Sequence, residues 1–159
     1  MSRARELPAI VLVRPRNPLN IGAAARSMAN FGFSDLRVVS PHPPVWREAL
    51  DSAVGARSVL RGAKVFSGLA EATADRRLVL GASSLKGRRP RLPVRELPGL
   101  IPGEAWAVLF GPEKSGLGER DFAAADAILR IPTGPGCPSM NLGQAVAVVC
   151  YELAARAYG

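Results

Sequence analysis

Short apolar runs alternate with segments of helical pattern along most of the chain, and this alternation limits the choice of fold more than any other feature. Each run is nearly continuous in apolar residues, which is typical of strands buried on both faces of a parallel sheet. Strands are predicted at residues 8–15, 36–40, 64–68, 77–83, 105–111 and 127–132. Helices are predicted at residues 20–32, in one or two pieces over 45–63, at 69–75 and at 141–159. The sequence therefore predicts an α/β fold with a mostly parallel sheet flanked by helices.

Residues that favour helix ends stand at the ends of two predicted helices. Asn20 can cap the first helix and Gly32 can close it. Asn141 stands where the cap of the last helix belongs. That last helix is apolar on nearly all sides from Ala145 to Tyr151, so a second surface must cover it. This second surface can belong either to another subunit or to a long loop of the same chain.

The chain has the features of one compact domain. A break is expected near Gly55, and residues 84–103 predict a long surface loop because they are rich in Pro, Gly and Arg. There is no internal repeat and no convincing domain boundary. We therefore expect a single domain over residues 1–159 with no separate binding domain.

Composition excludes several classes of protein. With 48% hydrophobic residues the chain is too apolar to be disordered, yet no apolar run approaches the roughly 18 residues of a membrane span. Its first residues have no signal-peptide pattern, so a cytoplasmic location is expected. Cys137 and Cys150 do not make a disulfide framework. His42 is the only histidine, which argues against a Ser-His-Asp triad and a His-rich zinc site.

The charge favours a polyanionic partner. The net charge is +8, from 21 Lys and Arg against 13 Asp and Glu, and most of the excess is Arg. The planar guanidinium of Arg can donate two parallel hydrogen bonds to a phosphate group, so the expected partner is a nucleic acid. An Arg-rich composition can also follow from a GC-rich genome. Aromatic residues make up only 6%, which argues against a surface on which bases stack.

Three polar, glycine- or proline-rich segments follow predicted strands, where ligands bind in open parallel sheets. They are "RPRNPLNIGAAAR" after the first strand, "FGPEKSGLGERD" at 110–121 and "IPTGPGCPSMN" at 131–141. None fits a familiar nucleotide motif: no G-x-G-x-x-G follows the first strand, and Gly116 is followed by Leu117 where a phosphate loop has Lys. No Cys and His cluster has metal-ligand spacing, so no metal is expected.

Taken together, the segments "NPLNIGAAAR", "FGPEKSGL" and "IPTGPGCPSMNLGQAVAVVCYEL" resemble motifs 1, 2 and 3 of the SpoU/TrmH family of SPOUT RNA methyltransferases, and most closely its TrmJ-like branch. The resemblance implies a deep trefoil knot in the C-terminal half. It also implies an S-adenosyl-L-methionine donor bound in that knot, a homodimer, no metal, and methyl transfer to a ribose 2′-hydroxyl.

The same resemblance assigns roles to residues of this chain. The residues that match catalytic positions of the three motifs are Asn20, Arg26, Glu113, Ser139 and Asn141. The residues that match donor-binding positions are Ala82, Ser83, Ser84, Gly111, Ile131, Pro138, Ser139 and Met140. The charge of the 84–95 stretch, and not the resemblance, makes its basic residues expected RNA contacts beside Arg26, namely Lys86, Arg88, Arg89 and Arg91.

Elementary chemistry limits what these residues can do. Attack of a 2′-hydroxyl on a sulfonium methyl builds negative charge on oxygen, which the Arg26 guanidinium can stabilise. Arginine side chains in general are too basic to act by literal deprotonation, so we expect electrostatic stabilisation. Glu113 can orient Arg26 or a neighbouring loop. Simpler interpretations remain: Arg26 as a solvated helix residue, Asn141 as a helix cap, and the basic stretch at 84–95 as a solvated loop.

The expected activity is that of an S-adenosyl-L-methionine-dependent tRNA (cytidine/uridine-2′-O-)-methyltransferase acting on nucleotide 32 of the anticodon loop. One alternative is another ribose of tRNA or rRNA, including the wobble nucleotide. A second is an RNA-binding SPOUT module without catalysis, although Arg26, Ser139 and Asn141 speak against it. A protein acting on a small molecule fits the basic charge least well.

Overall fold

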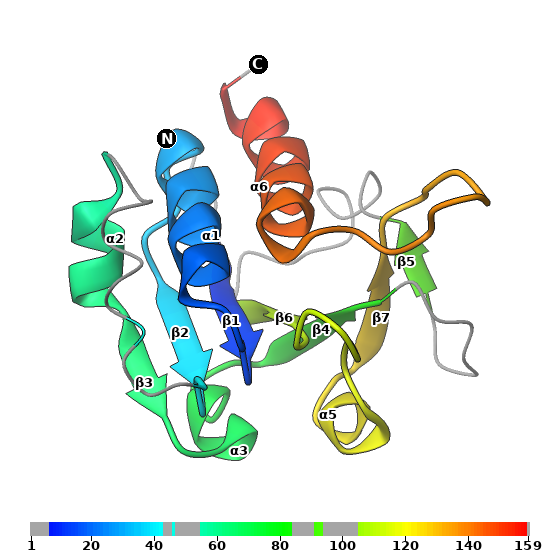
Figure 1. Cartoon of the computed structure of the whole chain (residues 1–159), viewed down its shortest axis with the longest axis horizontal. Helices are drawn as coiled ribbons and strands as arrows, with labels where there is room; N and C mark the ends of the chain where they lie inside the picture. Colours follow the sequence, from blue (N-terminus) through cyan, green and yellow to red (C-terminus); the bar gives the residue numbers. More distant parts are fainter. Residues whose placement is uncertain (1–6, 43–45, 47–54, 84–90, 94–104, 159) are drawn as a thin grey trace.

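Seven parallel strands form one sheet in the order β3-β2-β1-β6-β4-β7-β5 (Figure 1). The fold comes from a computed structural model, which describes residues 7–42, 46, 55–83, 91–93 and 105–158. The strands are β1 (Ala9–Val13), β2 (Leu36–Val39), β3 (Lys64–Phe66), β4 (Leu78–Ala82), β5 (Arg91–Pro93), β6 (Trp106–Phe110) and β7 (Ala127–Arg130). The helices are α1 (Pro18–Asn30), α2 (Arg57–Gly62), α3 (Leu69–Ala72), α5 (Glu119–Ala123) and α6 (Leu142–Tyr158). The predicted α/β class is confirmed.

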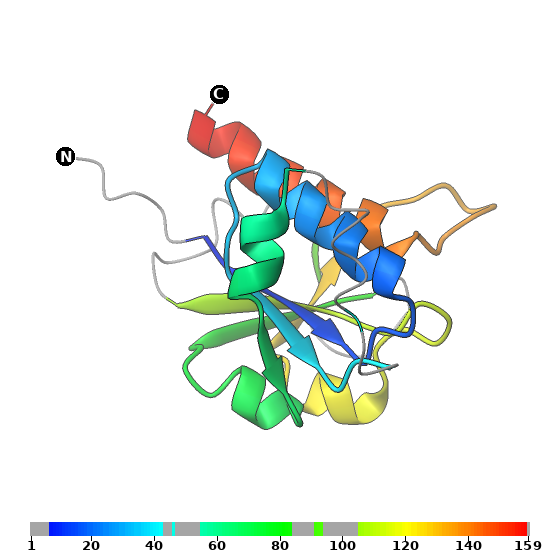
Figure 2. The ribbon, with the colours of Figure 1, turned by 60° about the vertical axis from the view of Figure 1, so that its left-hand side comes forward.

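Helices cover both faces of the sheet, as Figures 1 and 2 show: α1, α2 and α6 on one face, α3 and α5 on the other. Strand β1 explains how the core divides, since it lies between β2 and β6 and is buried throughout. Ile10 and Leu12 belong to the apolar cluster under α1 and α6, whereas Val11 and Val13 belong to the cluster that includes Ala72 of α3. Alternate side chains of one strand therefore serve two cores.

The start of α1 differs from the prediction. Asn17 caps the helix, because its Oδ1 accepts a hydrogen bond from Leu19 N at 3.0 Å, and Pro18 occupies the first helical position. Proline fits there because the N–H that it lacks would have no partner inside the helix. Asn20 is therefore not the cap, and its side chain is available for another contact. Gly32 follows the helix at a φ of 82°, as its predicted role in closing the helix requires.

The start of α6 agrees with the prediction that Asn141 caps it. Asn141 Oδ1 accepts hydrogen bonds from Gly143 N at 2.9 Å and from Gln144 N at 3.3 Å. These two bonds satisfy N–H groups that have no partner inside the first helical turn. The cap fixes the point at which the 131–141 segment becomes a helix.

Two short elements were not predicted. Strand β5 lies inside the segment expected to be a loop and pairs with β7, at the edge of the sheet formed by the described strands. Helix α5 follows the glycine-rich second segment and is five residues long. Elements this short carry too few residues to show a period. The rest of 84–103 lies outside the described residues.

A buried arginine of β2 links the sheet to α3, on the face that α3 and α5 cover. Arg37 of β2 is 3% exposed and donates to Ala72 O at 2.8 Å, and it forms ion pairs with Asp35 and Asp75. Hydrogen bonds from Arg37 and Arg76 hold the pKa of Asp75 well below its usual range. The buried guanidinium therefore has charged and neutral acceptors around it, as a charge removed from water requires.

Both cysteines are free thiols, as expected, with Cys137 exposed and Cys150 buried. Within the described part of the chain, every helix is too short or too polar to cross a membrane.

Candidate active site

The carboxyl ends of β4, β6 and β7 surround a cavity of about 260 Å³. Three segments and the first turn of α6 form its wall. The lining residues are Ala82, Ser83, Phe110, Gly111, Pro112, Glu113, Lys114, Ser115, Gly116, Leu117, Ile131, Thr133, Pro138, Ser139, Met140, Leu142 and Ala145. The cavity thus lies at the sheet edge where ligands bind in parallel α/β folds.

The segment 111–117, called here the glycine loop, folds back on itself at one side of the cavity. Gly116 N donates to Pro112 O at 2.8 Å, and Gly116 has a φ of 66°. A Cβ added to Gly111 would lie 2.3 Å from the carbonyl carbon of Gly116. Any side chain at Gly111 would therefore open the loop, so glycine is required at this position.

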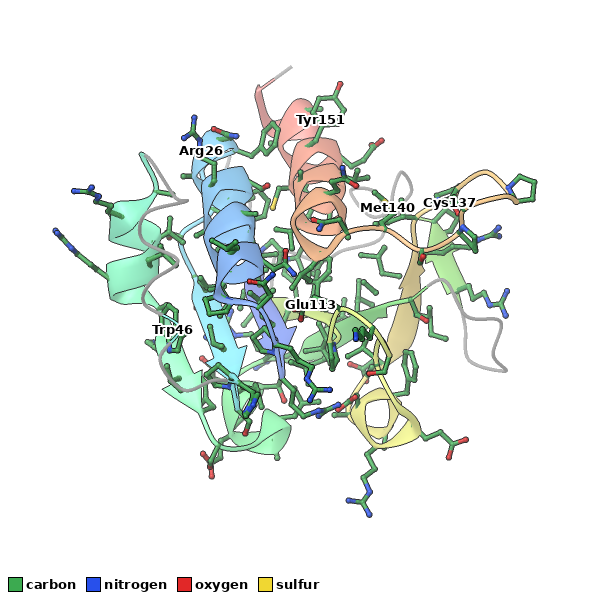
Figure 3. The ribbon with its side chains drawn as sticks, in the orientation of Figure 1. Arg26, Trp46, Glu113, Cys137, Met140 and Tyr151 are labelled. Carbon is green, nitrogen blue, oxygen red and sulfur yellow. The ribbon has the colours of Figure 1, made fainter. Side chains whose placement is uncertain are left out.

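Glu113 links the glycine loop to the segment that leads into α1. Its carboxylate accepts hydrogen bonds from Arg16 N at 2.9 and 3.2 Å and from Asn20 Nδ2 at 3.1 Å. Figure 3 shows Glu113 beneath the N-terminal end of α1. These hydrogen bonds join Glu113 to the segment before α1 and to the first turn of that helix, whereas Arg26 lies elsewhere on the helix (Figure 3).

The 131–141 segment forms the opposite wall and is shaped by its own hydrogen bonds. Thr133 Oγ1 donates to Pro138 O at 3.3 Å, and Cys137 N donates to Gly134 O at 3.3 Å. Ser139 and Met140 follow and line the cavity (Figure 3 labels Met140 and Cys137). The cap at Asn141 lies next in the chain, so the helix start anchors this wall.

Small residues bring α1 and α6 into close contact. A Cβ on Gly143 would lie 2.7 Å from Ala23 Cβ, and Ser27 Oγ donates to Gly143 O at 3.3 Å. This contact explains the run of Gly and Ala after Asn20, since larger side chains would push the two helices apart. The packing fixes the first turn of α6, which lines the cavity.

The predicted donor-binding residues come together. Of the eight, seven line the cavity, namely Ala82, Ser83, Gly111, Ile131, Pro138, Ser139 and Met140. Ser84 lies outside the described residues. Their separation along the chain shows that the fold, and not local sequence, assembles this wall.

The predicted catalytic residues are only partly brought together. Ser139 and Glu113 line the cavity, and Asn20 contacts Glu113. Asn141 caps α6 and does not line the cavity. Arg26 is exposed on α1, also outside the lining, and Figure 3 places it toward the C-terminal end of that helix, away from Glu113 and Met140.

Three of the five predicted RNA-contact residues belong to the part of the 84–95 stretch that precedes β5. Lys86, Arg88 and Arg89 lie outside the described residues. Arg91 is half-buried in β5, where it pairs with Ile128 of β7 at the edge of the sheet.

Some residues of the site were not predicted from the sequence. Lys114, Thr133 and Ala145 line the cavity, and their position inside the three motif segments was the signal that could have found them. An ion pair between Arg14 and Asp121 beside the glycine loop was also missed, because no local pattern links residues so far apart. The described residues hold no group of His, Cys, Asp and Glu that could bind a metal ion.

Comparison with known proteins places this architecture in a family. Residues 8–151 match the SpoU rRNA methylase family. The chain is 39% identical to an uncharacterised tRNA/rRNA methyltransferase, LasT, of Escherichia coli, over 91% of this chain and 67% of LasT. It is 36% identical to the tRNA (cytidine-2′-O-)-methyltransferase TrmJ of Methanocaldococcus jannaschii, over 91% of this chain and 66% of that protein.

Solved structures agree with the sequence matches. The crystal structure of TrmJ from Z. mobilis ZM4 superposes with a TM-score of 0.88 and 39% identity, over 96% of this chain and 70% of that one. The chain thus spans about two thirds of the length of these relatives. The fold, the site at the carboxyl ends of the strands and these matches lead to one conclusion: the chain belongs to the SpoU rRNA methylase family.

Proposed function

We propose that the protein is a tRNA 2′-O-methyltransferase that uses S-adenosyl-L-methionine. The cavity carries the proposal, because residues from three distant segments line it at the carboxyl edge of the sheet. Membership of the methylase family and the name of the TrmJ relative support it.

The chemistry of the wall fits this donor. Ile131, Met140 and Leu117 offer apolar surface, while Gly111 brings backbone groups to the cavity without a side chain in the way. The proposed donor-binding residues are Ala82, Ser83, Gly111, Ile131, Pro138, Ser139 and Met140, with Ser84 adjacent in sequence. When bound, the donor supplies an electrophilic methyl group on a sulfonium.

The remaining steps depend on the protein's own side chains. Ser139, at the cavity wall, positions the ribose, and the hydrogen-bonded Glu113 and Asn20 fix the glycine loop. Arg26 stabilises the negative charge that develops on the 2′-oxygen. Asn141 acts by anchoring the 131–141 segment through the α6 cap.

Since Arg26 lies outside the cavity of its own subunit, we propose that a second copy of the chain brings it to the site. Leu19 on α1 and Tyr151 on α6 are 59% and 57% exposed although they are apolar or aromatic. Leu19 and Arg26 are seven residues apart, so they lie on the same face of α1. A homodimer that covers this face would therefore also hold Arg26 at its interface.

The proposal includes the deep trefoil knot that the resemblance implies for the C-terminal half. The strand order supports it, since β6 is inserted between β1 and β4, and β7 between β4 and β5. The cavity is formed by the segments that follow these two inserted strands.

The proposed substrate is tRNA, in the cytoplasm, with the target ribose at cytidine or uridine 32 of the anticodon loop. The net charge of +8 supports a nucleic-acid substrate. Lys86, Arg88, Arg89 and Arg91 are the proposed RNA contacts beside Arg26.

The test is incubation with labelled S-adenosyl-L-methionine and total tRNA, followed by mapping of the modified nucleotide. The expected product is a 2′-O-methylated pyrimidine at position 32, and a tRNA with a 2′-deoxyribose there should accept no label. Label on the ribose of another nucleotide would support ribose methylation but would show that position 32 is not the target. A base-methylated nucleoside would contradict the reaction, and no transfer to tRNA or rRNA would favour a non-catalytic RNA-binding module.

A further inference from the structure

A bidentate ion pair joins the residue after β1 to Asp121 in the short helix α5, which follows the glycine loop. Arg14 Nη1 donates to Asp121 Oδ1 at 3.0 Å, and Nη2 donates to Oδ2 at 2.8 Å. Arg14 directly follows β1, and its N donates to Val39 O at 2.7 Å, so its backbone is held by the sheet. The side chain therefore starts from a backbone position fixed at the end of a buried strand.

The backbone of Arg14 has an unusual conformation. Its φ is 48°, in the left-handed region that residues other than glycine rarely adopt. Such a conformation persists only where the surrounding contacts enforce it. At Arg14 the conformation occurs where the chain turns from β1 toward Arg16, whose N–H contacts Glu113.

Asp121 receives hydrogen bonds from two directions. Its side chain is 5% exposed, and besides Arg14 it accepts a bond from Gly118 N at 2.8 Å. Burial by itself would raise the pKa of Asp121, but the bonds from Arg14 and Gly118 N outweigh burial and lower it. The carboxylate is therefore charged at neutral pH and holds Gly118, the residue that directly follows the glycine loop.

The segment from Arg14 to Asn20 thus holds the glycine loop at two points. Glu113 is held within the loop by Arg16 N and Asn20, and Asp121 is held just beyond it by Arg14. Between these points Leu117 is 3% exposed, and it lies so close to β4 that a Cβ on Gly81 would be 3.1 Å from its Cδ1. A change at Asp121 therefore reaches the cavity wall through a short, tightly packed segment.

We propose that Arg14 is a positioning residue for the donor cavity: by holding Asp121, it fixes the glycine loop in the form that binds the methyl donor. This inference rests on the proposed donor. Arg14 itself does not line the cavity, and its side chain is 47% exposed. A half-exposed ion pair adds little to the free energy of unfolding of the whole protein. Its loss should therefore change mainly the conformation of the glycine loop.

The experiment compares Arg14→Met with Arg120→Met. Arg120 is exposed on α5 next to Asp121, so its replacement makes the same change of charge without breaking the pair. In Arg14→Met we expect the Kd for S-adenosyl-L-methionine, measured by calorimetry, to rise about tenfold, the size of losing one charged hydrogen bond. The kcat at saturating donor should stay within about twofold, because the pair acts on binding and not on the reacting groups. Arg120→Met should match the wild type.

Arg14→Lys separates a positioning role from simple loss of charge. Lysine keeps the positive charge but cannot donate two parallel hydrogen bonds to Asp121, so it should restore the Kd only in part. Full restoration would show that charge alone is enough and would overturn the positioning role, as would an unchanged Kd in Arg14→Met. A fall in kcat with Kd unchanged would contradict the inference too.

Hydrogen exchange of the protein without donor tests the same inference independently of the proposed function. Amides of residues 111–121, including the bonded Gly116 N and Gly118 N, should exchange faster in Arg14→Met than in Arg120→Met. Equal exchange would overturn the inference. If the wild type binds no S-adenosyl-L-methionine but the loop still loosens, the proposed donor fails while the positioning role stands. If Arg14→Met does not fold, Arg14→Lys and its exchange rates decide the question.

Discussion

At the scale of single residues, the site separates the groups that shape the cavity from the group proposed to act on the substrate. Glu113 has donors from Arg16 and Asn20, so its carboxylate is committed to holding the glycine loop. Arg26 lies on an exposed face of α1. Within one subunit the donor cavity can therefore form without Arg26.

This separation predicts the behaviour of Arg26→Ala. Methyl transfer should fall by at least about 100-fold, because the developing charge on the 2′-oxygen loses its stabilising cation. The Kd for S-adenosyl-L-methionine should not change, since Arg26 is absent from the cavity wall. Single-turnover assays and calorimetry measure the two quantities. Equal loss of both would show that Arg26 has a structural role.

Mixing two inactive variants tests whether Arg26 acts across subunits. Gly111→Ala places a Cβ against the backbone of Gly116 and should destroy the donor cavity. If a partner supplies Arg26, random mixing of Arg26→Ala with Gly111→Ala should restore about a quarter of wild-type activity, since half the dimers then contain one complete site. No recovery, with mixed dimers demonstrated by mass spectrometry, would place Arg26 in the site of its own chain.

At the scale of elements, the close packing of α1 against α6 affects the site because the first turn of α6 lines the cavity. In Gly143→Ala the new Cβ would lie 2.7 Å from Ala23 Cβ, so we expect the free energy of unfolding to fall by about 1–3 kcal/mol. Urea denaturation measures this. Gly62→Ala in α2 is the matched control, because a Cβ there meets nothing within 4 Å. A Gly143→Ala protein as stable as the control would show that the helices can separate without cost.

The link between β2 and α3 predicts how stability depends on pH. The folded-state pKa of Asp75 lies below its unfolded value, owing to hydrogen bonds from Arg37 and Arg76. Its contribution is therefore complete above the unfolded pKa and is lost as pH falls through about 4 and below. Urea midpoints from pH 7 to pH 2.5 should fall less steeply in Asp75→Asn than in the wild type. If the urea midpoints of the two proteins fall in parallel, Asp75 does not contribute to the loss of stability in acid.

Sequence predicted the long elements and missed those that depend on tertiary pairing. The six predicted strands are present, and in runs such as 105–111 the reason is that continuous apolar residues have to be buried. Strand β3 is the exception, since it is short and largely exposed. Strand β5 has three residues and exists because β7 offers it an edge. The cap of α1 is Asn17 and not the predicted Asn20, because Pro18 occupies the first helical position and the helix starts two residues earlier than predicted.

The candidate site shows the same division. The family motifs pointed to Gly111, Ser139 and Met140, and these residues do line the cavity. The contacts of Glu113 with Asn20 and of Arg14 with Asp121 join distant parts of the chain, and neither partner carries a local sign of the other. The position of Arg26 outside the cavity also follows only from three-dimensional packing.

At the scale of the whole molecule, the exposed face of α1 and α6 predicts the oligomeric state. Tyr151→Asp places a charge on this face, so we expect a monomer by analytical ultracentrifugation and loss of methyl transfer. Val65→Asp, at a half-exposed position on edge strand β3, is the control and should remain dimeric and active. A monomeric wild type that still transfers methyl groups would contradict the homodimer.

The strand order also governs when the fold can form. Ile10 of β1 lies opposite Val108 of β6, so one of the central pairings of the sheet joins parts of the chain that leave the ribosome far apart in time. Until β6 emerges, β1 has an open apolar edge that invites pairing with other nascent chains. Pairings this distant along the sequence also slow folding. Biosynthesis of this protein should therefore pass through a long interval in which a chaperone, and not the native sheet, shields its first strand.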